Sequence, residues 1–342
     1  MTNKIDFVVT WVDGNDDVWR EEKKKYEIIE KGDARDSRYR EWDTLRYWFR
    51  GIEKFAPWVN KVFFVTCGHY PEWLNLHHEK LVHVSHKDFI PEKYLPTFSC
   101  RPIEFNLHKI PGLSEKFVYF NDDMYILRPV SESDFFKNDL PCDAAILDAT
   151  SITTKGRSNE KIPLNSIYST LLYNTAVING NFNKNRVIRE NLSKWFSPHY
   201  GLSLIRTVLL LPWGEFTGFK SAHLPYSYLK SSFDEVWNYE EEALNQACSH
   251  RFRNNQDVSS RLISDWQLVT GKFAPRSNSI GKQFYINNSA ENNEQVYKII
   301  SGQKYKLICI NDEYSGDNFD QEKKKMKKAF QTIFPEKSSF EV

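Results

Sequence analysis

The chain alternates between short apolar runs and segments of helical periodicity, and this alternation limits the folds open to it. The runs are rich in β-branched and aromatic residues, as strands are, and they span residues 5–11, 61–66, 81–86 and 116–120. Residues 38–55 carry apolar side chains at helical spacing, and Pro57 prevents continuation of that helix. Strands that alternate with helices form a mostly parallel sheet, so we predict an α/β fold.

Later segments extend this pattern. A short helix is predicted over residues 102–110, because Pro102 suits a first helical turn and Pro111-Gly112 would end the helix. Further strands are expected at residues 142–149 and 305–312, and further helices at 183–195 and 234–248. We expect a single α/β domain over residues 1–318, followed by a basic helical tail over residues 319–342.

The charge balance argues against a nucleic-acid partner. The chain has 46 Lys and Arg against 45 Asp and Glu, a formal net charge of +1, so no basic field covers it. Its five cysteines are far apart without a CxxC pair, which indicates neither a zinc site nor a disulfide framework. The N-terminal apolar run is too short for a signal peptide, and no later stretch is long enough to span a membrane. We therefore expect a cytoplasmic protein with reduced cysteines.

Polar residues follow two of the predicted strands. Asn121, Asp122 and Asp123 come directly after the run that ends at Phe120, and Asp13 follows the first run. In a parallel sheet, ligands bind outside the carboxyl ends of the strands. Two carboxylates and an amide there could hold Mg²⁺ or Mn²⁺. The alternative is a turn whose side chains bind backbone groups, and the residues alone leave both interpretations open.

Four other residues are candidates for proton transfer or for binding an anion. Glu104 and His108 stand four residues apart and would share one helix face, as a base with its orienting partner, as a ligand pair, or as solvated surface. His223 and Arg253 are isolated in polar segments, where a structural role is the default interpretation. The Lys-rich stretch 323–328 could lie on an anionic membrane or form a solvated terminal helix.

Several longer motifs resemble those of the Stealth family of sugar-phosphate transferases. They are TWVDGND from Thr10, TLRYWFRGI from Thr44, APWVNKVFFVTCGHYPEWL from Ala56, LPTFSCRPIEFNLHKIPGLSEKFVYFNDDMY from Leu95 and CINDE from Cys309. The resemblance is dense over residues 5–130 and thinner over 219–270 and 305–313. His69, Ser99-Cys100 and Pro102 depart from the commoner pattern, which affects the selection of the donor more than the reaction class.

The resemblance implies a Rossmann-like, GT-A-type glycosyltransferase-like core and a phosphotransferase reaction. A hexose 1-phosphate would pass from a UDP-sugar to a hydroxyl of a saccharide acceptor, with release of UMP, in capsule or cell-surface polysaccharide synthesis. Glu104, Asp123, His223 and Arg253 would be catalytic, and Asp122 and Asp123 would hold Mg²⁺ or Mn²⁺. Thr10, Asp13, Gly14, Arg46 and Asn121 would bind the donor.

Some alternatives remain open after this comparison of motifs. Either His223 or Glu104 could be the general base, and a neutral imidazole suits that step near pH 7. The chain could instead be an ordinary glycosyltransferase that releases UDP, or a non-catalytic module that binds a sugar nucleotide or a polysaccharide. A lipid-linked glycan acceptor would place the enzyme at the inner face of the cell membrane, which the basic tail would approach.

Overall fold

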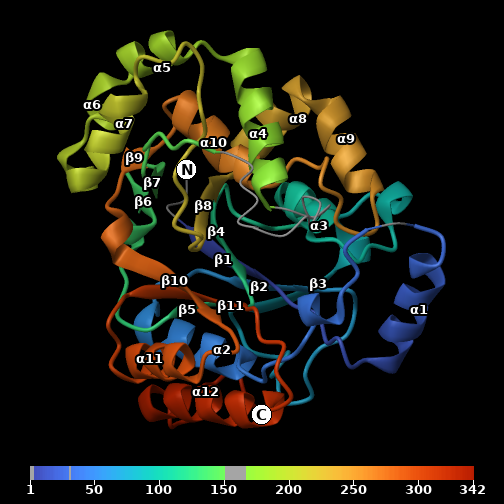
Figure 1. The fold of residues 1–342 in the computed structure, drawn as a ribbon. Helices are drawn as coiled ribbons and strands as arrows, with labels where there is room; N and C mark the ends of the chain where they lie inside the picture. Colours follow the sequence, from blue (N-terminus) through green and yellow to red (C-terminus); the bar gives the residue numbers. More distant parts are fainter. Residues whose placement is uncertain (1–3, 31, 151–166) are drawn as a thin grey trace.

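A five-stranded sheet forms the centre of the computed structural model, which describes residues 4–30, 32–150 and 167–342 (Figure 1). From edge to edge its strands are β3 (Leu81–Ser85), β2 (Val62–Thr66), β1 (Ile5–Thr10), β4 (Lys116–Asn121) and β8 (Tyr226–Leu229). The first four strands are parallel, and β8 runs antiparallel to β4. The predicted α/β fold with a mostly parallel sheet is confirmed.

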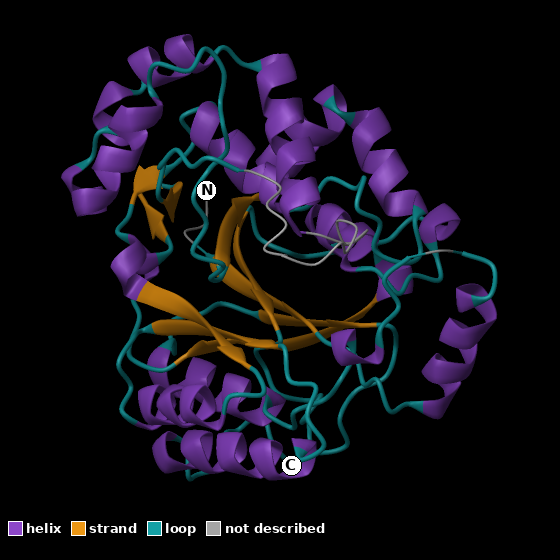
Figure 2. Ribbon diagram, viewed as in Figure 1, coloured by secondary structure: helices purple, strands orange, loops and turns teal. Residues whose placement is uncertain are grey.

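Helices cover both faces of this sheet (Figure 2). Side chains of β1 alternate between two cores, since Phe7 and Val9 join one and Val8 joins the other. The first core contains residues of α2 (Leu45–Phe55), α11 (Ala290–Ser301) and α12 (Phe319–Ile333). The second contains residues of α3 (Cys100–Asn106), α8 (Lys230–Tyr239), α9 (Glu241–Ser249) and α10 (Arg261–Val269).

Two small sheets flank the main one. The first consists of β10 (Gly281–Ile286), β11 (Leu307–Asp312) and β5 (Met124–Ile126), in that order. The second consists of β6 (Phe136–Lys137), β7 (Leu140–Asp143) and β9 (Ala274–Pro275). Only Asp122 and Asp123 separate β4 from β5, so this two-residue turn joins the main sheet to the first small sheet.

The register of the parallel strands brings their carboxyl ends to one edge. Thr10, the last residue of β1, lies opposite Val65 of β2 on one side and Asn121 of β4 on the other. The loop after β1 and the Asp122-Asp123 turn therefore leave the sheet side by side.

The remaining helices form outer layers. They are α1 (Asp17–Glu27), α4 (Ile167–Asn181), α5 (Lys184–Glu190), α6 (Leu192–Trp195) and α7 (Leu204–Leu210). Short 3-10 helices span Asp36–Arg38, His86–Asp88, Glu92–Tyr94, Leu107–Lys109, Glu132–Asp134, Pro198–Ser203 and Asn278–Ile280. The predicted helices at 183–195 and 234–248 are each divided in two, at Asn191 and Glu240, whose backbones leave the helical region.

Two other predicted elements differ from the observed ones. The helix expected over 38–55 begins only at Leu45, because Asp43 adopts a left-handed conformation with φ of 53°. The strand expected over 142–149 ends at Asp143, as β7. Residues 144–147 are buried without regular pairing, and Leu147 forms only an isolated bridge with Phe219. An apolar run in the sequence therefore predicts that its residues are buried more reliably than it predicts that they pair in a strand.

The C-terminal helix α12 packs into the first core despite its many lysines. Met326, Ala329, Phe330 and Ile333 are buried along one side, at the spacing of an amphipathic helix. The Phe330 ring stacks on Tyr47 of α2 with centroids 5.4 Å apart. Residues 319–333 of the expected tail are helical, and the inner side of this helix completes the core. The division into a domain over residues 1–318 and a tail over 319–342 stays a prediction.

This packing predicts a large loss of stability from Phe330→Ala. The side chain is fully buried, so its truncation should lower the free energy of unfolding by ~3–5 kcal/mol in urea denaturation. Lys324→Ala, at an exposed position of the same helix, should change it by less than about 0.5 kcal/mol. Equal effects of the two substitutions would contradict the burial of this helix.

Candidate active site

The Asp122-Asp123 turn is fixed between two sheets by backbone pairing. The Ile310 N–H donates to the carbonyl oxygen of Asp123 at 2.9 Å, and β5 pairs antiparallel with β11, with Met124 opposite Cys309. The two residues form a tight turn, and their carboxylates lie at the edge of the sheet where α/β proteins bind ligands. The arrangement is therefore compatible with a turn and with a metal site.

Asp123, His223 and Cys309 form a compact cluster at this edge. One ligand-type atom from each of them lies within 4.8 Å of the others. The Asp123 Oδ1 atom is buried, and no hydrogen-bond donor reaches it among the described residues. A buried carboxylate oxygen without a partner is uncommon and calls for a proton, a cation or a substrate group.

The pKa values of Asp123 and His223 are shifted by their surroundings in this cluster. Burial raises the pKa of Asp123, although the proximity of His223 and of the Cys309 thiol opposes the rise. Burial lowers the pKa of His223 below its usual 6.5, while Asp123 and Glu104 act in the opposite sense. The His223 imidazole is therefore neutral at pH 7 and free to accept a proton.

Asp122 occupies a more open position than its neighbour. Loss of water around its carboxylate raises the pKa of Asp122 well above the usual value, and the adjacent Asp123 adds to the rise. Asp122 nevertheless remains exposed as a residue, so solvent screens part of both effects.

His223 also has a strained backbone. Its φ is 45°, a left-handed conformation that residues other than glycine seldom adopt. Its Nδ1 atom lies 3.2 Å from the hydroxyl oxygen of Tyr226, which orients the ring. Strain of this kind persists where the surrounding structure holds a side chain for a function.

Some of the possible ligand atoms of the cluster suit a hard cation, and others do not. The unpaired oxygen of Asp123, with the nearby Asp122 carboxylate, is the type of ligand that Mg²⁺ and Mn²⁺ bind. Burial raises the pKa of the Cys309 thiol well above its usual value, and its Sγ donates to Asn311 Oδ1 at 3.1 Å. A protonated thiol is a poor ligand for these ions, so the two carboxylates are the candidates to hold the cation.

Glu104 is held from several sides beside this cluster. Its carboxylate is buried and accepts hydrogen bonds from Ser260 Oγ at 2.7 Å and Tyr119 OH at 3.3 Å. Arg101 lies 3.6 Å from the same carboxylate. The Tyr119 hydroxyl is also 3.1 Å from Thr10 Oγ1, so a hydrogen-bonded chain runs from Glu104 to the end of β1.

The loop between α9 and α10 brings Arg253 toward the acidic residues. The Asp33 N–H donates to the carbonyl oxygen of Arg253 at 3.0 Å, and Asp257 accepts a bond from the Asn254 N–H at 3.1 Å. Burial raises the pKa of Asp123, and the Arg253 charge opposes that rise. The guanidinium, which stays charged in proteins, is therefore part of the electrostatic environment of Asp123.

The structure separates Glu104 from His108. The helix tightens to 3-10 geometry from Leu107, and His108 stacks on Phe233 with Nε2 3.6 Å from Asp234. Because both carboxylate oxygens of Glu104 accept bonds elsewhere, the interpretation of His108 as its orienting partner is wrong.

The loop after β1 is tightly folded around Asp13 and Gly14. The Asp13 N–H donates to His69 Nε2 at 2.9 Å, and Asp13 Oδ1 accepts from the Asn15 N–H at 2.8 Å. A Cβ atom on Gly14 would lie 2.0 Å from the carbonyl oxygen of Tyr39, so no side chain fits there.

The other predicted donor-binding residues have varied positions. Thr10 and Asn121 lie side by side at the ends of β1 and β4, whereas the Arg46 guanidinium stacks 5.2 Å above the Trp73 ring. The roles of Thr10, Asp13, Gly14, Arg46 and Asn121 in binding a donor stay predictions.

Sequence reasoning did not assign four residues that shape the site. They are Tyr119, Tyr226, Ser260 and Cys309. Cys309 was visible as the first residue of the CINDE motif, and that motif was the available signal, since Cys309 lies inside β11 and not at its end. Nothing local to Ser260 indicates its contact with Glu104, which lies 156 positions away and meets it only in the tertiary fold. Tyr226 is three residues from His223, so that contact is local.

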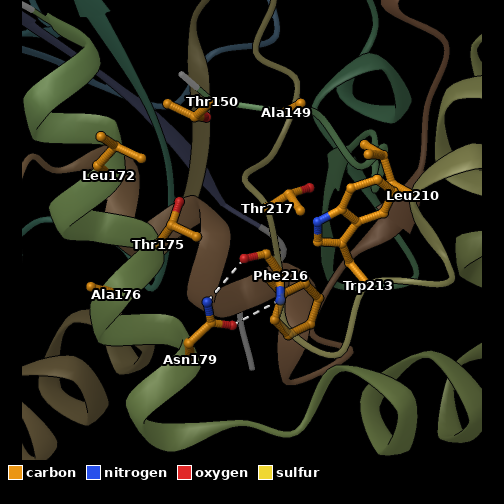
Figure 3. A pocket seen from close by; sticks show the side chains of 10 residues that line it. All are labelled: Ala149, Thr150, Leu172, Thr175, Ala176, Asn179, Leu210, Trp213, Phe216 and Thr217. Carbon is orange, nitrogen blue, oxygen red and sulfur yellow. Dashed lines mark hydrogen bonds between the residues drawn. The ribbon is translucent and has the colours of Figure 1, made fainter. Parts of the chain in front are cut away.

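A cavity of about 510 Å³ lies apart from these residues (Figure 3). It is lined by Ala149, Thr150, Leu172, Thr175, Ala176, Asn179, Leu210, Trp213, Phe216 and Thr217. The Asn179 side chain exchanges two hydrogen bonds of 2.9 Å with the Phe216 backbone (Figure 3). None of the lining residues carries a charge, so this cavity does not suit a nucleotide sugar.

Comparison with known proteins places the chain in a family. The family descriptions Stealth protein CR1, conserved region 1, and Stealth protein CR2, conserved region 2, match residues 3–30 and 38–142. The chain is 44% identical to a capsular polysaccharide phosphotransferase, WcwK, of Streptococcus pneumoniae, over 99% of this chain and 98% of that protein. It is 40% identical to the receptor polysaccharide phosphotransferase WefC of Streptococcus gordonii, over 100% of both chains.

An exopolysaccharide phosphotransferase of Lactiplantibacillus plantarum, cps2G, is also 40% identical, over 98% of this chain and 96% of that protein. The chain therefore belongs to the Stealth family, as its motifs predicted. Among solved structures, the bifunctional glycosyltransferase WbbM aligns with a TM-score of 0.36 and 9% identity, covering 97% of this chain and 52% of that one. Similarity at that level carries no information on function.

The environment of Glu104 leads to a prediction about Ser260→Ala. The Ser260 hydroxyl donates to a buried carboxylate, so its removal should lower the free energy of unfolding by ~1.5–3 kcal/mol. The adjacent Ser259 is equally buried, but its hydroxyl accepts from the neutral Asn174 amide at 2.9 Å. Ser259→Ala should therefore cost only ~0.5–1.5 kcal/mol. Urea denaturation of both variants tests this order, and a reversed order would show that Glu104 does not depend on Ser260.

Proposed function

We propose that the protein transfers a hexose 1-phosphate from a UDP-sugar to a hydroxyl of a saccharide acceptor, forming a phosphodiester and releasing UMP. The observation that carries the proposal is the cluster at the sheet edge, where a neutral His223 meets the unpaired Asp123 oxygen. The names of the full-length relatives, all polysaccharide phosphotransferases, support the reaction class. The role would be in capsule or cell-surface polysaccharide synthesis.

His223 is the proposed general base. The acceptor oxygen attacks the phosphorus that bears the sugar, the bond from that phosphorus to the UMP oxygen breaks, and the acceptor proton passes to the imidazole. In the tautomer that the proposal requires, Nδ1–H donates to the Tyr226 hydroxyl oxygen, and the unprotonated Nε2 accepts this proton. Glu104 is less suited to the step, because Ser260 and Tyr119 already donate to its two oxygens.

The positive charge of Arg253 would stabilise the phosphate oxygens as charge develops on them and on the departing UMP. Glu104, which lies close enough to act on the charge of His223, would hold the imidazole and the guanidinium in place. When a divalent cation is bound by Asp122 and Asp123, it supplies further positive charge at the phosphates. Thr10, Asp13, Gly14, Arg46 and Asn121 are the proposed residues for binding the UDP-sugar.

The proposed acceptor is a lipid-linked glycan, and the proposed location is the cytoplasmic face of the cell membrane. In the part of the chain that the structure describes, no helix is both long and apolar enough to cross a bilayer. Contact with the lipid would therefore be peripheral.

Replacement of Asp123 by Asn tests the proposed centre. Asp123→Asn keeps the size of the side chain and removes its charge, so turnover should fall by about 100-fold or more. Asp317→Asn makes the same change at an exposed position and should keep full activity. The assay incubates each protein with a UDP-hexose, Mn²⁺ and an acceptor and identifies the nucleotide released, and circular dichroism checks the fold.

The product distinguishes the candidate functions. UMP supports sugar-phosphate transfer, UDP identifies an ordinary glycosyltransferase, and the absence of both products leaves a binding module. Wild-type activity in Asp123→Asn would exclude Asp123 from the centre.

The pH dependence tests the base. Burial lowers the pKa of His223 below its usual 6.5, and a base must be unprotonated, so kcat/KM should fall on the acidic side only below pH 6.5. His223→Gln should lower kcat/KM by about 100-fold or more and remove this acidic limb from the residual activity. An acidic limb that survives unchanged in the variant would assign the titration to another group.

A further inference from the structure

A short helix far from the cluster presents apolar side chains to solvent. Among the exposed large hydrophobic residues are Leu202, Ile205, Val208, Leu209 and Trp213, with Leu202 86% exposed and Leu209 67%. We name these five residues the α7 face. Their spacing places them on one side of α7 and its flanking turns. Trp213 also lines the cavity of Figure 3, so the apolar surface continues into that depression.

The α7 face is a rigid part of the fold. The fully buried Lys184 ammonium donates to the carbonyl oxygens of Leu210 at 3.3 Å and Leu211 at 3.0 Å, and also to that of Trp213. This satisfies the carbonyls at the C-terminus of the helix and places a positive charge where the helix dipole favours one. On the opposite side of the helix, the buried Thr207 hydroxyl accepts from the Leu147 N–H at 3.2 Å. The exposed apolar residues are thus held in a fixed arrangement.

Positive charge accompanies this surface. Residues 184–220 contain six Lys or Arg residues and two Glu residues, but Lys184 is buried, and Arg186 and Arg206 pair with Glu190 and Asp148. The excess positive charge is therefore carried by the exposed Arg189 of α5 and by the half-buried Lys194 and Lys220, with the exposed Glu215 opposing it. Around the exposed apolar residues of α1 the balance is reversed, since residues 16–30 contain four Lys or Arg and six Asp or Glu. An apolar face with Leu, Ile and Trp side chains among basic residues is typical of proteins that bind the surface of an anionic membrane.

We infer that the α7 face docks on an anionic lipid bilayer, with its apolar side chains in the interfacial region and the nearby basic residues at the headgroups. The inference rests on the proposed function in one respect, because a lipid-linked acceptor would lie in the same membrane. Trp213 suits the interface, since its ring is apolar and its indole N–H can bond to headgroups or water.

The C-terminal helix is less suited to this contact than its lysines suggest. Lys323 and Lys327 pair with Asp43, and Lys325 pairs with Glu322 and Glu294. Its apolar residues face the core, and none of the exposed large hydrophobic residues in the described part of the chain belongs to α12. In Figure 1, α7 lies at the upper left and α12 along the bottom of the view, so the two surfaces can be tested separately.

Sedimentation with lipid vesicles tests the inference on the full chain. Wild-type protein should sediment with phosphatidylglycerol vesicles and much less with phosphatidylcholine vesicles. Ile205→Glu combined with Leu209→Glu should weaken the partition into phosphatidylglycerol vesicles by ~10-fold or more, because it places two charges in the docking face. The matched control, Val18→Glu combined with Ile28→Glu at exposed positions of α1 and just after it, should bind as the wild type does.

The alternatives give different results. Lys324→Glu combined with Lys328→Glu, at exposed positions of α12, should leave vesicle binding nearly unchanged, and a large loss there would move the contact to the C-terminal helix. Wild-type protein that fails to bind anionic vesicles would overturn the inference. So would an α7 variant that keeps vesicle binding but turns from dimer to monomer in sedimentation equilibrium, because the face would then be an interface between copies.

Failure of the membrane contact and failure of the proposed function are distinguishable. With a soluble acceptor, the α7 variant should release UMP at the wild-type rate, since its substitutions lie outside the reaction centre. Loss of vesicle binding with full UMP release supports the inference, whereas vesicle binding without UMP release in the wild type would refute the proposed function alone.

Discussion

The candidate site depends on one backbone arrangement, the two-residue turn that carries Asp122 and Asp123 from the main sheet to the first small sheet. The turn has almost no freedom, because β4 pairs with β1 on one side and the Ile310 N–H holds the Asp123 carbonyl on the other. The fixed backbone determines where the carboxylate leaves the chain, and burial there keeps one of its oxygens without a partner. In an isolated turn, water would solvate the same group.

Charged groups of both signs surround this turn in a partly buried site. Glu104 accepts from Ser260 and Tyr119, and the charge of Arg253 opposes the effect of burial, which raises the pKa of Asp123. His223, in contrast, is driven toward its neutral form, because burial lowers its pKa. One set of surroundings therefore contains a guanidinium, a hydrogen-bonded carboxylate and an unprotonated imidazole, and the proposed reaction assigns a role to each of them.

Much of the fold and of the candidate site could be predicted from the sequence. The features that could not be predicted have a common physical cause. The strands ending at Thr10 and Asn121 were visible as local apolar runs, and so was the acidic pair that follows the second of them. Cys309 and Ser260 were not identified as site residues, because each meets the site through tertiary contacts with residues more than a hundred positions away. The lysines of α12 suggested a solvated or membrane-bound tail, although Phe330 is buried against Tyr47. The lysines lie on the solvent side of the helix, whereas the apolar residues on its other side determine how it packs.

The division of the site between two sheets also has a mechanical consequence. Asp123 is the last residue before β5, a strand of the small sheet that also contains β11, whereas His223 precedes β8 at the edge of the main sheet. The separation between the carboxylate and the imidazole therefore depends on the pairing of β4 with β8 and also on how the small sheet packs against the main one. A substitution in α11 or α12 that moved the small sheet would change that separation without touching either residue.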